Sequence, residues 1–346
     1  MLNSKDRVAI YMESNLDSDY GKMGMGVIRY LSNQITCIID SNHVGKSIKS
    51  FINTDRKIPI VESLEIALEK KSTVLVLGIA PSGGKIPKEW NRIIEKALKN
   101  GLSLVNGLHE LLFPRWKDLI KKNKNQWIWD VRMPTFVPDI ATGKASKLKN
   151  KRILFIGTDM AVGKMTAALE IYSFLNKQSK NVGFVATGQI GITLTGNGIP
   201  LDAFKVDHAC GAVEAAVLEN SKKEIVLIEG QGSLLHPGST ATLPLMRGSC
   251  PTHLILCHRA NKKTLRSPKN IKIPDLKEFI YLNELLSTVS GTFPKAKVIG
   301  VALNTSHLSH NKAILSVNQL EKKLNIITTD VVRFGPDKIA KAILKS

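Results

Sequence analysis

The stretch that decides the fold is Ile153-Leu-Phe-Ile-Gly-Thr-Asp-Met-Ala-Val-Gly-Lys-Met-Thr166. Its first four residues are apolar and predict a buried strand. A loop bounded by Gly157 and Gly163 follows, and Lys164 then opens a predicted helix with an apolar face. Backbone N–H groups at a helix N-terminus attract anions, and a lysine adds a positive charge. The stretch therefore predicts a phosphate-binding loop.

This loop is similar to a Walker A loop but departs from it in two ways. Five residues, Thr158 to Val162, separate its glycines, whereas the plain motif has four. Met165 stands where a magnesium-binding hydroxyl is usual. The sequence leaves open whether the loop binds magnesium-ATP or another phosphate ligand. The residues expected to bind phosphate here are Gly157, Asp159, Gly163, Lys164, Met165 and Thr166.

The bulk composition predicts a cytoplasmic protein of ordinary globular type. With 346 residues, of which 43% are hydrophobic and 23% charged, the chain is long enough for two domains. No apolar run reaches the roughly 20 residues that span a membrane, and the first residues lack the apolar core of a signal peptide. The four cysteines are far apart in sequence, which disfavours a disulfide framework.

The net charge of +20 is the unusual figure. Lys and Arg outnumber Asp and Glu by 24 to 15 in residues 1–150 and by 25 to 14 in residues 151–346, so the excess is diffuse. Nucleic-acid binders usually concentrate charge on one face and add aromatic residues, which are only 5% here. The diffuse distribution of the charge and the few aromatic residues therefore disfavour a nucleic-acid partner. The positive charge itself suits an anionic small substrate. A homo-oligomer stays open.

Strands and helices alternate along the whole chain. Predicted strands cover residues 7–12, 35–40, 73–78 and 102–105 in the first half, and 153–156, 181–187, 224–228, 252–257, 298–304 and 326–332 in the second. Such alternation predicts parallel α/β sheets, which bind ligands at the carboxyl ends of their strands. We expect one α/β domain over residues 1–125, a connector over 126–150 and a second α/β domain over 151–346. The Gly83-Gly84 turn suits either a tight turn or an anion site.

The strongest candidate to work with Lys164 is Glu229, which ends the apolar strand 224–228. An acid at that position can hold magnesium in P-loop proteins, together with Thr166 in this chain. It can also be a turn carboxylate. His236 and His258 follow two strand ends, and each could be a general base or a structural histidine. Cys257 closes an apolar strand and is expected to be a core residue.

Further charged residues could bind substrate. Asp202, Asp207 and Glu214 could contact an ammonium group or a metal, or be solvated helix residues. Six basic residues and no acid occupy positions 259–272, beginning with Arg259, and could meet phosphates or form a solvated loop.

Two motifs resemble known P-loop proteins. Gly157-Thr-Asp-Met-Ala-Val-Gly-Lys164 resembles the phosphate loop of dethiobiotin synthetase, and Glu229-Gly-Gln-Gly232 is similar to that enzyme's strand-end motif. A resemblance over nearly the whole chain adds Gly21 to Tyr30, Trp129 to Arg132, Glu229 to Gly238 and Leu256 to Arg259. It is to a two-domain family of largely unassigned function, with an N-terminal Rossmann-like domain and a C-terminal P-loop NTPase-like domain. That family includes D-glutamate N-acetyltransferase.

The resemblance implies an acyltransferase of D-amino acid metabolism that moves acetyl from acetyl-CoA to D-glutamate or a similar acidic amino acid. The glycine loop and Gly230, Gln231 and Gly232 would then face CoA phosphates or a reaction oxyanion. Arg259 or Arg132 would clamp a carboxylate or phosphate, Asp207 would contact substrate, and Glu229, His236 or His258 would move the proton. The rival is an ATP- and magnesium-dependent kinase or ligase acting on a small carboxylate, or a nucleotide-sensing module.

Overall fold

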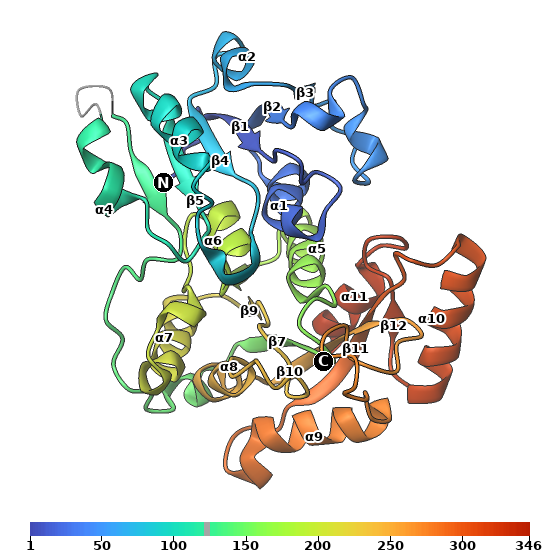
Figure 1. Cartoon of the computed structure of the whole chain (residues 1–346). Coiled ribbons are helices and arrows are strands. Elements are labelled where there is room, and N and C mark those ends of the chain that lie inside the picture. Colours follow the sequence, from blue (N-terminus) through green and yellow to red (C-terminus); the bar gives the residue numbers. More distant parts are fainter. Residues whose placement is uncertain (121–124) are drawn as a thin grey trace. The chain divides into compact units, whose positions relative to one another are not determined.

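A computed structural model describes residues 1–120 and 125–346. The chain forms two compact units. The N-terminal unit is Met1–Pro134 with Gln189–Pro200, and the C-terminal unit is Thr135–Gly188 with Leu201–Ser346. Each unit contains one six-stranded, all-parallel sheet, as the alternation of strands and helices predicts (Figure 1).

The N-terminal sheet has the strand order β3-β2-β1-β4-β5-β6. Its strands are β1 (Arg7–Tyr11), β2 (Gln34–Ile39), β3 (Ile60–Val61), β4 (Val74–Leu77), β5 (Ser103–Asn106) and β6 (Ile128–Asp130). Its helices are α1 (Lys22–Tyr30), α2 (Leu64–Glu69), α3 (Trp90–Lys99), α4 (Phe113–Trp116) and α6 (Gln189–Thr195). Apolar residues from α2 and α3 pack on β1, β2, β4 and β5 to form the core. This order is the one known from Rossmann-like sheets.

Two segments differ from the sequence prediction. The expected connector of residues 126–150 contains β6, which pairs with β5 from Leu104↔Ile128 to Asn106↔Asp130. Residues 189–195, a glycine-bearing stretch after a strand, form α6, which contacts α1. Gly26 permits this contact, because a Cβ there would lie 2.5 Å from Cγ2 of Ile190. Packing on a flat helix face thus stabilises a short helix whose residues are weak helix formers.

The C-terminal sheet has the order β12-β11-β10-β7-β9-β8. Its strands are β7 (Lys151–Gly157), β8 (Val182–Val185), β9 (Ile225–Ile228), β10 (His253–Arg259), β11 (Lys297–Asn304) and β12 (Thr328–Thr329). Its helices are α5 (Lys164–Lys177), α7 (Val206–Glu219), α8 (Thr242–Ser249), α9 (Leu276–Thr288), α10 (His310–Leu324) and α11 (Asp337–Lys345). On one face, α5 and α11 pack side by side over β7, β9 and β10.

The strand order decides which loops can meet. β7 pairs with β10 on one side and with β9 on the other. The loops that follow these three strands therefore emerge next to one another at the carboxyl edge of the sheet, where parallel α/β sheets bind ligands.

Among the described residues, no helix combines the length and the apolar character needed to cross a membrane.

Candidate functional site

The glycine loop joins the end of β7 to the start of α5. Gly163, with φ of +107°, makes the left-handed turn into the helix, which a residue with a side chain adopts only under strain. Lys164 is only 4% exposed. Its Nζ donates to the carbonyl oxygens of Asp159 (2.8 Å) and Met160 (3.0 Å), so the ammonium lies inside the loop. Burial lowers the pKa of Lys164 to about 8.

Glu229 directly follows β9, next to the glycine loop. Its side chain is buried, and its Oε2 accepts hydrogen bonds from the backbone N–H groups of Thr187 (2.9 Å) and Gly188 (3.2 Å). Burial raises the pKa of Glu229 to about 7, against the opposing effect of those two donors and of the charge on Lys164. Within the described residues, the other oxygen, Oε1, receives no hydrogen bond. Glu229 therefore combines a pKa near neutrality with an unused acceptor.

The glycine after Glu229 has a packing role. A Cβ on Gly230 would lie 1.6 Å from the carbonyl oxygen of Phe155 in β7, so no larger residue fits. Beyond the strand, Ser239 Oγ accepts from the N–H of Ser233 at 3.2 Å. The N–H groups of Gln231 and Gly232 have no acceptor in the part of the chain that the structure describes. Two backbone N–H groups without an acceptor among the described residues therefore come two and three residues after Glu229 in the sequence.

His258 is the second-to-last residue of β10, whereas the sequence predicts that it follows the end of that strand. It is 6% exposed, and its Nδ1 shares a hydrogen bond of 2.9 Å with Oγ1 of Thr158 in the glycine loop. Burial lowers the pKa of His258 to about 4, so the ring is neutral near pH 7 and a weak base. Its neighbour Cys257 is fully buried, as expected for the core, and burial raises the pKa of its thiol to about 12.

His236 has both ring nitrogens engaged. Nδ1 accepts from the N–H of Gly238 (3.1 Å), which leaves Nε2 to donate to the carbonyl oxygen of Ser267 (2.7 Å). Asp159 is engaged in a similar way, since its two oxygens accept from the N–H groups of Met160 (2.7 Å) and Arg266 (2.7 Å). Both residues, predicted as a base and a phosphate contact, hold loops of the C-terminal unit together in this structure.

The acids on α7 do not form a shared site. Asp207 and Glu214 are on one helix, as predicted, but Asp207 is exposed in its first turn. Glu214 is buried, and it accepts from the N–H groups of Thr142 (2.8 Å) and Ala145 (3.4 Å). Glu214 therefore fixes the segment that precedes β7. Among the described residues, no group of three or more His, Cys, Asp and Glu side chains is arranged to hold a metal ion.

Arg132 belongs to the N-terminal unit and lines a cavity of about 180 Å³ there. Its Nε donates to the carbonyl oxygen of Gly107 (2.7 Å), and its Nη2 donates to Oε1 of Gln189 (3.1 Å). Gly83, Gly84 and His109 also line the cavity, which lies at the carboxyl ends of β4 and β5. The predicted carboxylate clamp thus borders a hollow at the ligand-binding edge of its own sheet.

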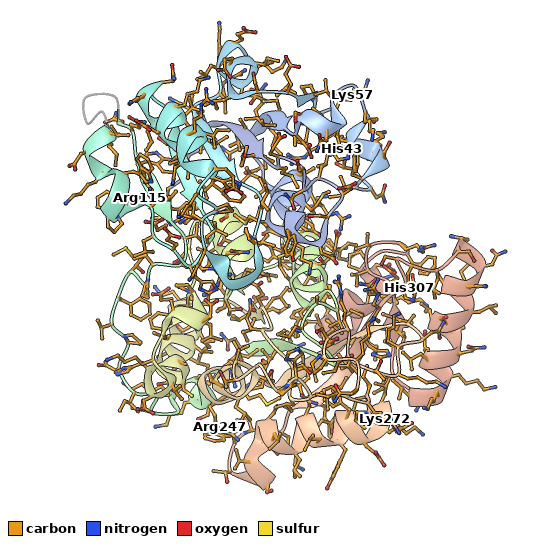
Figure 2. All side chains as sticks on the ribbon, viewed as in Figure 1. His43, Lys57, Arg115, Arg247, Lys272 and His307 are labelled. Atoms are coloured by element: carbon orange, nitrogen blue, oxygen red, sulfur yellow. The ribbon has the colours of Figure 1, made fainter. Side chains whose placement is uncertain are left out.

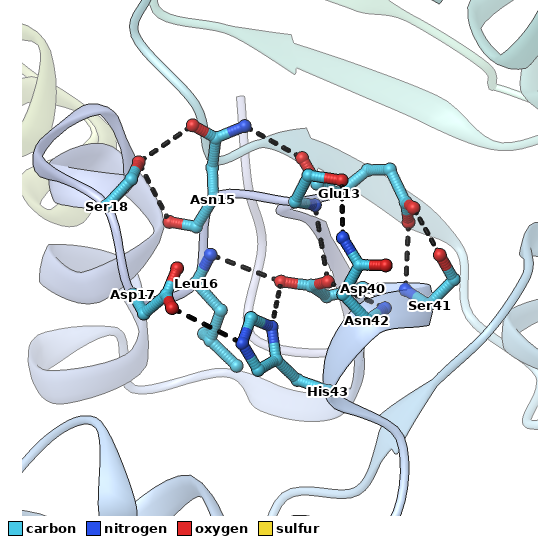
Figure 3. Close-up of polar contacts among 10 residues, drawn as sticks. Glu13, Asn15, Leu16, Asp17, Ser18, Asp40, Ser41, Asn42 and His43 are labelled. Carbon is cyan, nitrogen blue, oxygen red and sulfur yellow. Dashed lines mark hydrogen bonds and ion pairs between the residues drawn. The ribbon is translucent and has the colours of Figure 1, made fainter.

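An acid at that edge, Asp40 after β2, has a structural role. It is fully buried and accepts from the N–H groups of Ser14 (3.2 Å), Leu16 (3.1 Å) and Asn42 (3.2 Å), and Figure 3 shows Asp40 with Leu16 and Asn42. His43 Nδ1 adds a contact of 2.9 Å. In dinucleotide-binding sheets an acid near this position holds a ribose hydroxyl. Here all of these bonds go to the unit's own loops.

Several residues that contact the predicted side chains within each unit were not themselves predicted. Thr158 positions His258, Thr187 and Gly188 hold Glu229, and Gln189 contacts Arg132. All four follow the end of a strand, at β7 or β8, and that position is the one signal in the sequence that could have marked them.

Comparison with known proteins agrees with the two-unit architecture. Residues 139–340 match a family described as "Domain of unknown function (DUF1611_C) P-loop domain", and residues 41–134 match "Domain of unknown function (DUF1611_N) Rossmann-like domain". A crystal structure of a DUF1611 family protein from Anabaena variabilis is 43% identical and covers 99% of this chain and 100% of its own, with a TM-score of 0.94.

Two similar proteins carry the name D-glutamate N-acetyltransferase. The one from Tritonibacter scottomollicae is 34% identical over 284 residues, which are 81% of this chain and 84% of that protein. The one from a Pseudoalteromonas species is 36% identical over 267 residues, 76% of this chain and 79% of that protein. With a Rossmann-like N-terminal unit, a P-loop C-terminal unit and these matches along most of its length, the chain belongs to the DUF1611 family.

Proposed function

We propose that this protein transfers the acetyl group of acetyl-CoA to the amine of D-glutamate or a similar acidic amino acid. The observation that carries the proposal is a buried carboxyl with a pKa of about 7, that of Glu229, which follows β9 beside a glycine loop with a buried lysine. The two relatives named D-glutamate N-acetyltransferase support the choice of reaction.

The proposed base is Glu229. A general base works best when its pKa lies near the working pH, and the pKa of Glu229 is about 7, whereas that of His258 is about 4. Using His236 would break its bond to Ser267 or to Gly238. Oε1 of Glu229 takes a proton from the substrate ammonium group, and the freed amine nitrogen attacks the thioester carbonyl carbon.

The rest of the reaction needs an oxyanion site and a proton for the leaving group. The N–H groups of Gln231 and Gly232 are the proposed donors to the tetrahedral oxyanion. When the carbon–sulfur bond breaks, the CoA sulfur takes a proton that the nitrogen loses, and the amide is formed. Lys164 and the glycine loop bind the CoA pyrophosphate, for which Nζ of Lys164 exchanges its bonds to Asp159 and Met160.

A steady-state assay with purified full-length protein, acetyl-CoA and D-glutamate tests the activity, with the acetylated product identified by mass spectrometry. We expect N-acetyl-D-glutamate and free CoA in equal amounts. L-Glutamate and D-glutamine serve as acceptor controls. A folded protein that yields no acetylated product with any acidic amino acid would overturn the proposal.

An ATP-dependent reaction is the second candidate, because the same loop could hold magnesium-ATP with Thr166 and Glu229 at the metal. Met165 disfavours it, since this half-buried thioether occupies the usual hydroxyl position. Thermal shift separates the two candidates. Stabilisation by CoA without ATP favours acetyl transfer, and stabilisation by ATP with magnesium but not by CoA favours the rival.

A further inference from the structure

Residues 259–272 begin at the last residue of β10 and continue into a hairpin, and this whole stretch is called the basic hairpin. Thr264 and Lys272 form an antiparallel bridge, the N–H of Leu265 donates to the carbonyl oxygen of Ile271 (2.9 Å), and the N–H of Ile273 donates to that of Lys263 (2.8 Å). Leu265 is 1% exposed and anchors the hairpin in the unit. The basic residues are Arg259, Lys262, Lys263, Arg266, Lys269 and Lys272, and there is no acid (Lys272 is labelled in Figure 2).

Two hydrogen bonds attach this hairpin to the candidate site. Oδ2 of Asp159, in the glycine loop, accepts from the N–H of Arg266 at 2.7 Å. Nε2 of His236, in the loop after β9, donates to the carbonyl oxygen of the next residue, Ser267, at 2.7 Å. The hairpin is therefore held beside the glycine loop and is not a solvated loop placed at random.

Asp159 places a negative charge in the loop that is expected to bind phosphate. Such a charge repels a phosphate unless cations lie nearby to offset it. Here both oxygens of Asp159 accept backbone N–H bonds, from Met160 and from Arg266, and these donors stabilise its negative charge. The same bond brings the six cations of the hairpin to the loop. A single anionic residue thus links the phosphate loop to a cluster of positive charge.

From this arrangement we propose that the basic hairpin binds the 3′-phosphate of CoA while the glycine loop binds the pyrophosphate. CoA carries these two phosphate groups at separate positions of its adenosine, and one glycine loop can enclose only one of them. The four lysines of the hairpin are exposed, and Nε of Arg259 is a buried donor without an acceptor in the described part of the chain. The inference rests on the proposed function, because it takes acetyl-CoA as the substrate.

Isothermal titration calorimetry with CoA and dephospho-CoA tests the proposal, since the two ligands differ only in the 3′-phosphate. For the wild-type protein we expect roughly tenfold or greater preference for CoA, as several exposed charge pairs of modest strength would give. In the hairpin variant Lys262→Gln, Lys263→Gln, Lys269→Gln, Lys272→Gln the preference should fall to less than about twofold. Its affinity for dephospho-CoA should change little.

A matched control separates the hairpin from the overall positive field. Lys177, Lys180, Lys312 and Lys322 are exposed lysines of the same unit, and changing all four to Gln lowers the net charge by the same four units. This variant should keep the wild-type preference. An equal loss of the preference for CoA in both variants would overturn the proposal, because the overall positive charge of the unit would then explain that preference.

Two further outcomes separate a failure of the hairpin proposal from a failure of the proposed function. If wild-type protein binds CoA and dephospho-CoA equally, the hairpin proposal is wrong while acetyl transfer stands. If wild-type protein binds neither ligand and produces no acetylated amino acid, the proposed function is wrong, and the hairpin proposal is overturned with it.

Discussion

The carboxyl edges of the two sheets carry similar acids in different states. At the N-terminal edge, Asp40 is saturated by its own loops, and Asp130 accepts from the N–H groups of Leu112 (2.9 Å) and Phe113 (2.8 Å). At the C-terminal edge, Glu229 has one engaged oxygen, and burial raises its pKa to about 7. A buried strand-end acid therefore does not by itself mark an active site. The oxygen of Glu229 that receives no hydrogen bond from the described residues is the difference on which its proposed role rests.

The largest expected effect is on Glu229. Glu229→Gln keeps the shape and can keep the bonds from Thr187 and Gly188 through its amide oxygen, but it cannot accept a proton. We expect kcat for acetyl transfer to fall by about 10²- to 10⁴-fold, the usual contribution of a general base. Asp130→Asn is the matched change at the carboxyl edge of the N-terminal sheet. Its kcat, calculated per folded molecule, should stay within about twofold of the wild-type value. A Glu229→Gln variant with wild-type kcat would remove the distinction between the two edges.

Lys164 should contribute to CoA binding while its charge lowers the stability of the fold. Its folded pKa of about 8 lies below the ordinary 10.5, so the charged lysine opposes folding in full below about pH 8, and this penalty fades between about pH 8 and 10.5. Lys164→Met should weaken CoA binding by about 10- to 100-fold. In urea titration at pH 7, its free energy of unfolding should not fall. Unchanged CoA affinity, or a large loss of stability, would contradict the assignment of the loop.

Asp40 should contribute to the stability of the fold and not to acetyl transfer. In Asp40→Asn, an amide group replaces one of the oxygens that accept N–H bonds, which leaves buried donors unpaired. We expect the free energy of unfolding to fall by about 2–4 kcal/mol. Measured on the folded fraction, kcat should not change. A stable variant that loses acetyl transfer would mean that Asp40 belongs to a site after all.

The smallest effect concerns Arg132. Arg132→Lys keeps a positive charge at the cavity but loses the planar group that reaches both Gly107 and Gln189. We expect Arg132→Lys to raise the Kd of the N-terminal cavity for D-glutamate about tenfold in calorimetry, because the planar guanidinium clamps a carboxylate better than an ammonium does. Gln189→Ala is the milder companion change. An unaltered Kd in both variants would exclude the clamp.

The sequence predicts the parts of this fold that depend on local pattern. Apolar strands, the Gly157–Gly163 loop and a helix that begins at Lys164 follow from residue order, and the family resemblance is confirmed by the matches along both units. β6 was assigned to the connector because it is only three residues long and the stretch that contains it carries Pro134 and Pro138. α6 was not predicted because its stability comes from packing on α1, which no local pattern shows.

The roles of individual site residues were harder to predict, because they depend on partners far along the chain. Asp159 bonds to Arg266 and His236 bonds to Ser267, and nothing in the spacing of these residues indicates that the hairpin docks there. The choice among Glu229, His236 and His258 as the base likewise depends on burial and on engaged nitrogens. Those quantities exist only in the folded chain.

The most direct test of the central claim is the pH dependence of kcat/KM for acetyl-CoA, which reports the titrating groups of the enzyme form that binds acetyl-CoA. With the acceptor saturating, the account predicts a rise through about pH 7 as Glu229 loses its proton and a fall through about pH 8 as Lys164 loses its charge. In Glu229→Gln the rising limb should vanish from the residual activity. A rising limb near pH 7 that persists unchanged in Glu229→Gln would contradict the account.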